Sequence, residues 1–551
     1  MNIQLAAFRY LEYIFHESSV GVKALLLDSE TLAYISVAMT KTELYTNEVV
    51  LIEELADRVR KPADPQVASL TCYCLIRPTQ ENVDLICQEL NNPSFAKYAL
   101  FFTNSIDDSL MHQIASNDSR SLVENCQEVF IDFSALGTRL FSLNIKDISN
   151  LRKNPALGEY SDRIILQLFA AICSLRLKPV IRYDKSSDLA GIIANGLSQV
   201  VVHNNDLFQN HRDDNALVLI LDRRNDPITP LLHFFFYLSS LHDLFGIENN
   251  IVTIGSNQYI LDERNDPETE KIDTMDLYHA GMAIHQRVDM MKQVSNQIKS
   301  TDLNSMNEKA LQVLQGANDQ TYAQTHMELF QQISAKAQPE AENLYDITAL
   351  GQIMASVNDP DDQFQQFCDI IRTNCTKKDA LRLALIFALH YEKSKPELID
   401  RVMATLNELG PWLNQEMKYF ETLFRISGQD KRSGDLFSNR SIFAKFKKGF
   451  KNATQDRSDD TFQLFQPQLE SIIKNIKDKK LSYTQFPLAT DSRKGEPQKV
   501  IIFYVGGATY KEHAIAANSS GDNGNGYQFI VGGTTIHNAN TFLQYEVEPF
   551  V

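Results

Sequence analysis

Short apolar runs with strand character alternate with amphipathic stretches over the first quarter of the chain. Between residues 22 and 133 these runs read VKALLLD, YISVAMT, VVLIEEL, SLTCYCLIRPT, YALFFTN and EVFIDF. Apolar runs of strand length that alternate with helical patterns indicate βα units, whose strands pair in parallel. The pattern therefore predicts an open, mostly parallel α/β sheet here, preceded by an amphipathic helix over residues 1–18.

A second set of strands follows, with KPVIRY, LVLILD and NIVTIG, before the pattern becomes helical between about 270 and 480. Strand character then returns in KVIIFYVGGATY and YQFIVGGTTIHN. Two strands alone are only marginally stable in water, so these last strands need a sheet to join. We expect them to pair with LVLILD, which makes the second α/β domain discontinuous and the helical region an insertion.

The chain of 551 residues is too long for a single hydrophobic core. We expect an N-terminal α/β domain over residues 1–133 and a second α/β domain built from 134–245 and 485–551. A mainly helical third domain would span 246–484 and contain a helical hairpin at about 285–350. The predicted fold class is α/β plus α.

Composition excludes several classes of protein. A net charge of −17 opposes binding to the phosphates of a nucleic acid. Seven cysteines, an odd number without regular spacing, indicate a reducing compartment. Cys72 and Cys74 alternate along a strand, so we interpret them as neighbours on one face and predict no metal and no cofactor. Because the chain contains neither a signal peptide nor an apolar run of about 18 residues, we expect a soluble protein with at most peripheral membrane contact.

The stretch LDRRNDPITPLL, residues 221–232, follows a predicted buried strand. Proline at 227 disfavours helix at Asp226, and Thr229 with Pro230 after it predicts a helix that starts there and continues through LLHFFFYL. We interpret four residues as a structural corner held by charge-assisted hydrogen bonds: Asp222, Arg223, Arg224 and Asp226. A catalytic alternative would use one of the aspartates as general base, but it lacks a nucleophile, a metal-ligand set and a phosphate loop. No catalytic residue is predicted.

The same stretch, followed by VIIFYVGGATYKE and VGGTTIHNANTFL, resembles the SM (Sec-one/Munc-eighteen) family of vesicle-fusion regulators. YALFFTN and FQPQLESIIKNIKDKKLSYTQFP stand in the order that this family has. The resemblance covers nearly the whole chain, and the GGATY and GGTTIHN pair is most similar to the branch that serves the endosomal and trans-Golgi syntaxin. It implies an arch-shaped, non-enzymatic clasp with two open sheet domains and a large helical domain inserted in the second.

The resemblance also implies partners. These would be a syntaxin (Qa-SNARE) of the endosomal or trans-Golgi type, the assembled SNARE bundle and a vesicle SNARE, with no nucleic acid. The protein would promote SNARE complex assembly during vesicle docking and fusion. It would work as a cytoplasmic monomer that reaches Golgi and endosomal membranes peripherally, through its SNAREs.

Three sites are carried over from the resemblance. Many members of the family bind a short syntaxin N-terminal peptide on the outer face of the first domain, where the matching residues are Ile106, Leu110, Met111, Ile114, Leu122, Cys126 and Glu128. The matching residues of the central cavity are Glu53, Glu54 and Arg58. On the hairpin that receives the vesicle SNARE, the candidates are Tyr322, Met327 and Phe330. Ordinary core or surface roles compete with each of these assignments, because helical spacing alone explains an apolar stripe.

The chain departs from the family pattern in three places. Cys126 stands where a larger aliphatic residue is usual, and Met111 stands where an aromatic is common; Met can still fill an adaptable slot. Gly316 occupies the expected hairpin tip, where relatives often have a proline. The segment 442–451 combines phenylalanines with lysines, so it is either an interfacial membrane helix or a docked surface helix.

Two other functions compete with SNARE binding. An α/β enzyme could use VGGATY and VGGTTIHN as phosphate loops, with His537 as acid or base. However, the chain lacks the common nucleotide, hydrolase and zinc motifs, and glycines at strand ends more often allow close packing. A vesicle tether or coat subunit without SNARE specificity is compatible with the composition.

Overall fold

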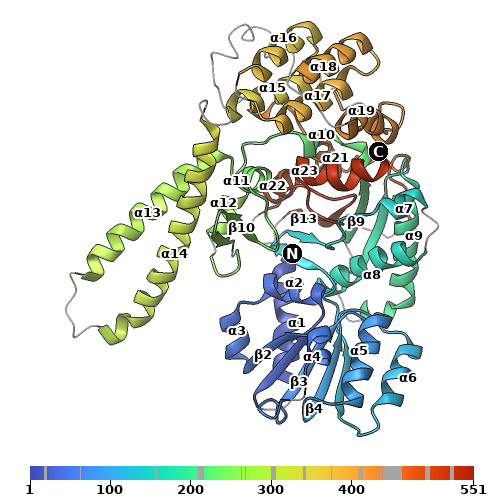
Figure 1. Ribbon diagram of the computed structural model, residues 1–551, viewed down its shortest axis with the longest axis vertical. Helices are drawn as coiled ribbons and strands as arrows, with labels where there is room; N and C mark the ends of the chain where they lie inside the picture. Colours follow the sequence, from blue (N-terminus) through green and yellow to red (C-terminus); the bar gives the residue numbers. More distant parts are fainter. Residues whose placement is uncertain are drawn as a thin grey trace.

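The computed structural model (Figure 1) consists of two α/β units, one above the other, and a helical region from which a long hairpin projects. It describes the chain except for residues 18–20, 63, 155–157, 209–215, 262, 267, 300–305, 339–342, 374, 409–413, 435, 438–461, 491–496 and 522–525. The segment 442–451 therefore lies outside the described residues. No helix among the described residues is both long and apolar enough to cross a bilayer.

The first sheet is fully parallel and has the strand order β2-β1-β3-β4-β5. Its strands are β1 (Lys23–Leu27), β2 (Val49–Glu54), β3 (Thr71–Ile76), β4 (Lys97–Phe102) and β5 (Val123–Glu128). The helices around it are α1 (Ile3–Glu17), α2 (Ser29–Ala38), α3 (Lys41–Thr46), α4 (Leu55–Arg60), α5 (Gln80–Asn91) and α6 (Asp108–Asn117). The predicted parallel sheet and first helix are confirmed. As predicted, Cys72 and Cys74 share one face, with their Sγ atoms 3.6 Å apart.

Two of the predicted strands in this region are wrong. YISVAMT belongs to α2, which starts early because the Asp28 carboxylate accepts the backbone N–H groups of Glu30 and Thr31 and caps the helix. EVFIDF is an irregular buried connector, whereas β5 lies just before it in the less apolar VENCQE. Strand β5 is an edge strand with one covered face, so polar residues alternate along it and hide its strand character in the sequence. The connector is apolar because it runs through the core, which made it resemble a strand.

The second sheet has the order β6-β7-β13-β12-β9-β8 and is parallel except for the β6–β7 pair. Its strands are β6 (Ser134–Gly137), β7 (Leu140–Ser142), β8 (Pro179–Tyr183), β9 (Ala216–Asp222), β12 (Lys499–Val505) and β13 (Gln528–Gly533). Strand β12 lies between β9 and β13, with Ile501 opposite Val218 on one side and Ile530 on the other. The predicted pairing of the C-terminal strands with LVLILD is confirmed. NIVTIG instead forms a separate hairpin of β10 (Ile251–Ile254) and β11 (Asn257–Ile260).

The helices of the second α/β unit are α7 (Ser149–Lys153), α8 (Gly158–Ser174), α9 (Asp188–His203), α10 (Ile228–Leu231), α11 (Tyr237–Leu244), α21 (Gln468–Lys477), α22 (Tyr510–Ser519) and α23 (Ala539–Phe542). The region between β11 and α21 is helical wherever it is described as regular structure. It comprises α12 (Thr269–Asp273), α13 (Leu277–Lys299), α14 (Met306–Ala337), α15 (Leu344–Ser356), α16 (Pro360–Ile371), α17 (Lys377–Tyr391), α18 (Pro396–Glu408) and α19 (Asn414–Ser427). Figure 1 shows α13 and α14 as the projecting hairpin and α15 to α19 as a bundle at the far end.

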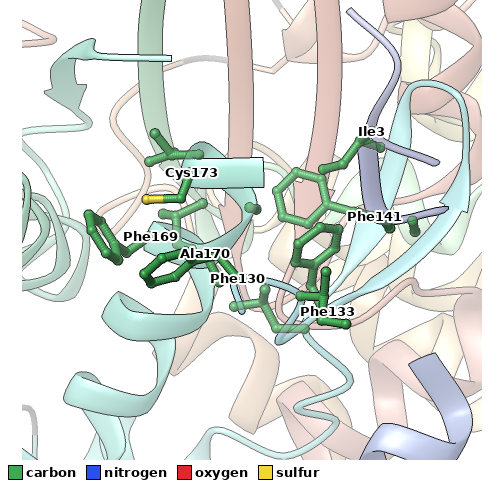
Figure 2. Close-up of a cluster of buried hydrophobic side chains, with 14 of the residues drawn as sticks. Ile3, Phe130, Phe133, Phe141, Phe169, Ala170 and Cys173 are labelled. Atoms are coloured by element: carbon green, nitrogen blue, oxygen red, sulfur yellow. The ribbon is translucent and has the colours of Figure 1, made fainter. Parts of the chain in front are cut away.

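One continuous apolar core joins the two sheets. It contains Ile3 of α1, Phe141 of β7, Phe169 of α8 and Phe503 of β12, all at most 1% exposed, together with residues of the first sheet such as Leu25. Figure 2 shows the aromatic part of this cluster, where Phe130 and Phe133 of the buried connector lie among residues of the second unit. The two units are therefore packed against each other. The domain boundaries at 133, 245 and 484 remain our proposal.

Candidate functional site

The residues predicted for peptide binding lie together on the outer side of the first sheet. Helix α6 packs beside the edge strand β5, and Ile106, Leu110, Met111 and Leu122 are half-buried around the fully packed Ile114. Exposed and half-buried residues alternate along β5, which leaves Cys126 and Glu128 at the surface. These residues form the slot, a half-buried apolar strip with a carboxylate at its end, a surface chemistry that suits a short peptide with apolar anchors and a basic residue.

Two contacts within the slot bear on its capacity to bind. The Cys126 Sγ lies 3.7 Å from the Met111 Sδ, so the two residues that depart from the family pattern face each other. The Glu128 carboxylate accepts the backbone N–H of Ile106 at 2.9 Å, which leaves its second oxygen for a ligand. A small thiol beside a flexible methionine makes an adaptable rather than a tightly shaped apolar surface.

The three predicted cavity residues differ in their availability. Arg58 is buried, and it pairs with Glu53 at 3.4 Å and donates to the Pro62 carbonyl at 2.8 Å. Lys61 also pairs with Glu53, at 2.9 Å. These two candidates are thus engaged inside the protein. Glu54, at the start of α4, is half-exposed and has no hydrogen-bond or ion-pair partner in the described part of the chain.

The predicted hairpin residues lie at the base of α14, where it packs on α13 and the body of the protein. Phe330 lies over Gly281, where an added Cβ would approach the ring to 2.5 Å, and it meets the His285 ring edge-on. Met327 packs against the same core, and Tyr322 is half-buried. The expected hairpin tip at Gly316 is wrong, because α13 ends at Lys299 and α14 already begins at Met306. The hairpin helices start at Leu277 and end at Ala337, both earlier than the expected range of 285–350.

Sequence reasoning missed exposed apolar side chains at the start of α13 and at the β2 edge of the first unit. Tyr278 and Met282 of α13 are 59% and 57% exposed, and Tyr45 of α3 and Val50 of β2 are similarly exposed. Figure 1 shows α3 and β2 on the side of the first sheet nearest the hairpin. The four-residue spacing of Tyr278 and Met282 places them on one helix face, opposite the buried Ile284, and this second stripe was the available signal.

The corner residues bind partners from distant segments. Asp222, at the end of β9, accepts two hydrogen bonds from the Arg152 guanidinium, at 2.9 and 3.1 Å, and Arg152 also pairs with Glu546 at 2.7 Å. Burial would raise the pKa of Asp222, but Arg152 outweighs it and holds the pKa at about 2. Arg223 pairs with Glu512. These ion pairs fasten the corner to α7, α22 and the C-terminal residues, in line with the structural interpretation.

The rest of the corner differs from its prediction. Asp226, rather than Thr229, caps the short helix α10: it accepts the Thr229 N–H at 3.0 Å and the Thr229 hydroxyl at 2.6 Å. The predicted helix through LLHFFFYL is wrong, because residues 232–236 between α10 and α11 are not helical. Here the Phe236 N–H bonds to the Phe234 carbonyl at 2.7 Å in a tight turn centred on Phe235, and Phe234 and Phe235 reach two different apolar clusters. Arg224 stacks on Phe550, with 5.0 Å between guanidinium carbon and ring centre.

Backbone groups of the first Gly-Gly segment are engaged within the protein. The Gly507 N–H points to Tyr504, the Gly506 N–H to the Thr534 hydroxyl, and the Gly507 carbonyl accepts from Arg223. A Cβ on Gly507 would lie 2.3 Å from His537, so this glycine provides close packing. His537 is buried, and burial, reinforced by Arg223, lowers its pKa to about 3. These contacts favour packing over the phosphate-loop alternative.

Known proteins resemble this chain in both sequence and fold. The model of the Sec1 family matches residues 23–545. The chain is 30% identical to vacuolar protein sorting-associated protein 45 of Dictyostelium discoideum, covering 95% of this chain and 93% of that protein. It is 29% identical to the human protein of the same name, with 99% and 96% covered. Among solved structures, the SM protein Vps45 in complex with the Qa SNARE Tlg2 has a TM-score of 0.85 at 25% identity, covering 99% and 97%.

Proposed function

Because the chain belongs to the Sec1 family, we propose that it is a SNARE-binding regulator of vesicle docking and fusion that binds a Qa-SNARE of the endosomal or trans-Golgi type. The observation that carries the proposal is full-length similarity, in sequence and in shape, to an SM protein solved together with a Qa SNARE. The protein would promote SNARE complex assembly without covalent chemistry, and it would work at endosomal and Golgi membranes to which its SNARE partners bring it.

The slot between α6 and β5 is our candidate for the syntaxin N-terminal peptide. Two buried apolar anchors at about 1.5–3 kcal/mol each provide about 3–6 kcal/mol before the costs of association and ordering are subtracted. The peptide alone should therefore bind weakly. Tight binding requires a second contact, for which we propose two exposed patches: Glu54, Tyr45 and Val50 on the first unit and Tyr278 and Met282 on the hairpin.

Calorimetric titration with the cytosolic part of such a Qa-SNARE tests the proposal. The titration is repeated with the SNARE lacking its N-terminal peptide, with Met111→Glu, and with His112→Glu as the matched control. His112 is exposed on the next position of α6, so its substitution adds the same charge away from the slot. We expect saturable binding that weakens on peptide removal and in Met111→Glu but is unchanged in His112→Glu.

Other results would change the proposal in defined ways. Binding that is indifferent to the peptide and to Met111→Glu would retain the Qa-SNARE as partner and transfer the main contact to the two patches. No saturable binding by the folded protein would contradict the proposed partner. That result would favour a vesicle tether or coat subunit, the class that has no SNARE specificity.

A further inference from the structure

One cavity lies mostly outside the surfaces described above. It has a volume of about 830 Å³ and lies where α1, the end of β5, the turn after α8 and the first residues of β12 and β13 meet. Glu128, at its border, is the single residue that it shares with the peptide slot. This volume lies within the range of about 300–1,000 Å³ that small-ligand sites occupy.

Positive charge predominates in this cavity although the whole chain carries −17. Arg9, Arg176 and Lys499 line it, against Glu128 as the one carboxylate. In the part of the chain that the structure describes, neither Arg9 nor Arg176 is engaged in an ion pair or a side-chain hydrogen bond. Both residues are exposed, whereas the buried Arg152 and Arg223 are engaged with carboxylates. Two uncommitted guanidinium groups at one cavity indicate an anionic ligand.

The backbone at Arg176 is a second and independent observation. Helix α8 ends in a Schellman motif, in which the Leu177 N–H bonds to the Ile172 carbonyl and the Arg176 N–H to the Cys173 carbonyl. Arg176 occupies the left-handed position of this motif, with φ of 54°, where glycine is strongly favoured. A cation anywhere in the last turn would compensate the helix dipole, so the dipole does not explain an arginine at this strained position. Strained non-glycine residues tend to lie at functional sites.

The remaining lining matches a ligand rich in oxygen. Tyr10 and Tyr13 of α1 line it together with Gln127, Gln498 and Gln528, and the Gln528 amide oxygen accepts a hydrogen bond from the Met1 amino group. Arg176 is close enough to Tyr10 to oppose the rise that burial causes in the pKa of its phenol. Forked guanidinium groups combined with neutral hydrogen-bond donors form the usual environment of a bound phosphate.

We propose that this cavity binds a compact phosphorylated anion, either a free polyphosphate or the phosphorylated headgroup of a lipid. The guanidinium groups of Arg9 and Arg176 and the ammonium group of Lys499 hold the phosphates, and the tyrosines and glutamines bind the rest of the ligand. Apart from Glu128 at its border, the site shares no residue with the proposed SNARE contacts.

The test uses the full chain and two probes. Inositol hexakisphosphate is titrated by calorimetry, and phosphatidylcholine vesicles with and without a phosphatidylinositol phosphate are used in flotation. The variants are Arg176→Gly, Arg9→Ala and, as the control, Arg372→Ala, whose side chain is 59% exposed on the distant helical bundle. Glycine suits the backbone at 176, so Arg176→Gly should melt at the same temperature as the unchanged protein or higher.

We expect saturable binding of at least one probe, weakened about tenfold or more in Arg176→Gly and Arg9→Ala and unchanged in Arg372→Ala. Binding of the free inositol phosphate alone would assign a free ligand, and binding of phosphoinositide vesicles with the same loss in the variants would assign the lipid headgroup. Failure of both probes to bind the unchanged protein would overturn the proposal. Equal binding by Arg176→Gly and Arg372→Ala would also overturn it, because the attraction would then not depend on the arginine at the cavity.

Discussion

Arg223 and Glu512 form an ion pair of 2.5 Å in which both side chains are completely shielded from solvent, although 289 residues separate them in the chain. The pair links the end of β9 to the first turn of α22, on the two sides of the helical region. Arg223 also donates to the carbonyls of Gly507 and Asp226. The two halves of the discontinuous unit are thus joined by a buried charge pair as well as by the β9–β12 ladder.

We expect this ion pair to show strong energetic coupling. Arg223→Met or Glu512→Leu leaves one buried charge without its partner, which should lower the free energy of unfolding by about 3–5 kcal/mol. The double variant should lose clearly less than the sum of the two single losses, because it leaves no unpaired charge. Urea denaturation of the four proteins measures the coupling. Simple additivity of the two losses would show that the residues act separately.

Replacing Gly507 should destabilise the protein in two ways, through its backbone conformation and through its close packing, and comparison with Gly255 separates the two contributions. Gly507 and Gly255 both have positive φ, but an added Cβ meets His537 at 2.3 Å at the first position and open space at the second. Gly255→Ala should cost about 1–2 kcal/mol of unfolding free energy, from the left-handed backbone alone. Gly507→Ala should cost about 1–3 kcal/mol more, from overpacking. Equal losses in denaturation would show that His537 moves aside freely.

Glu263 should make the protein less stable as the pH rises toward 8. Burial raises the pKa of its carboxyl to about 8, although the Thr138 N–H bonds to it and opposes the rise. The folded state therefore keeps a proton that the unfolded state loses above its ordinary pKa of about 4.3, so stability falls as the pH increases from about 4.3 to 8.

Glu263→Gln removes this proton equilibrium and keeps a side chain of the same shape. The variant should show a flatter dependence of melting temperature on pH between 5 and 8 and should exceed the unchanged protein in stability at pH 8. Glu124→Gln, on the exposed face of β5, is the control and should keep the original slope. An unchanged slope in Glu263→Gln would mean that this carboxyl is ionised in the folded protein.

If the slot between α6 and β5 binds the syntaxin peptide, enlarging the side chain at Cys126 should strengthen binding. Cys126→Leu adds apolar surface opposite Met111, and about 1 kcal/mol of additional burial corresponds to about a fivefold gain in affinity. His112→Leu adds similar surface away from the slot and should leave affinity unchanged. Calorimetry with the isolated peptide measures both. A loss of affinity in Cys126→Leu would indicate that the thiol leaves room that the peptide itself fills.

The outline of the sheets could be predicted from local patterns, because an apolar run indicates a buried segment. The family could be predicted because motifs such as LDRRNDPITPLL are specific to it. The return of the C-terminal strands to β9 followed from the same reasoning, since two strands cannot be stable alone. The pattern failed at β5, where an edge strand is half polar, and at 233–236, where an apolar run is not helical.

The candidate sites depended much more on tertiary structure. Sequence placed Glu53, Glu54 and Arg58 together, but only the folded chain decides that Arg58 is buried against Glu53 and that Glu54 is left without a partner.

The sequence by itself determined which segments are buried, which become strands or helices, and which family the chain resembles. The tertiary structure decided the partners of Asp222 and Arg223 and the cavity that Arg9 and Arg176 share. The residues next to a charged side chain in the sequence do not indicate which distant group it will contact. Apolar burial is nondirectional and can be read from residue spacing, whereas a hydrogen bond or ion pair needs two groups brought within about 3 Å by the whole fold.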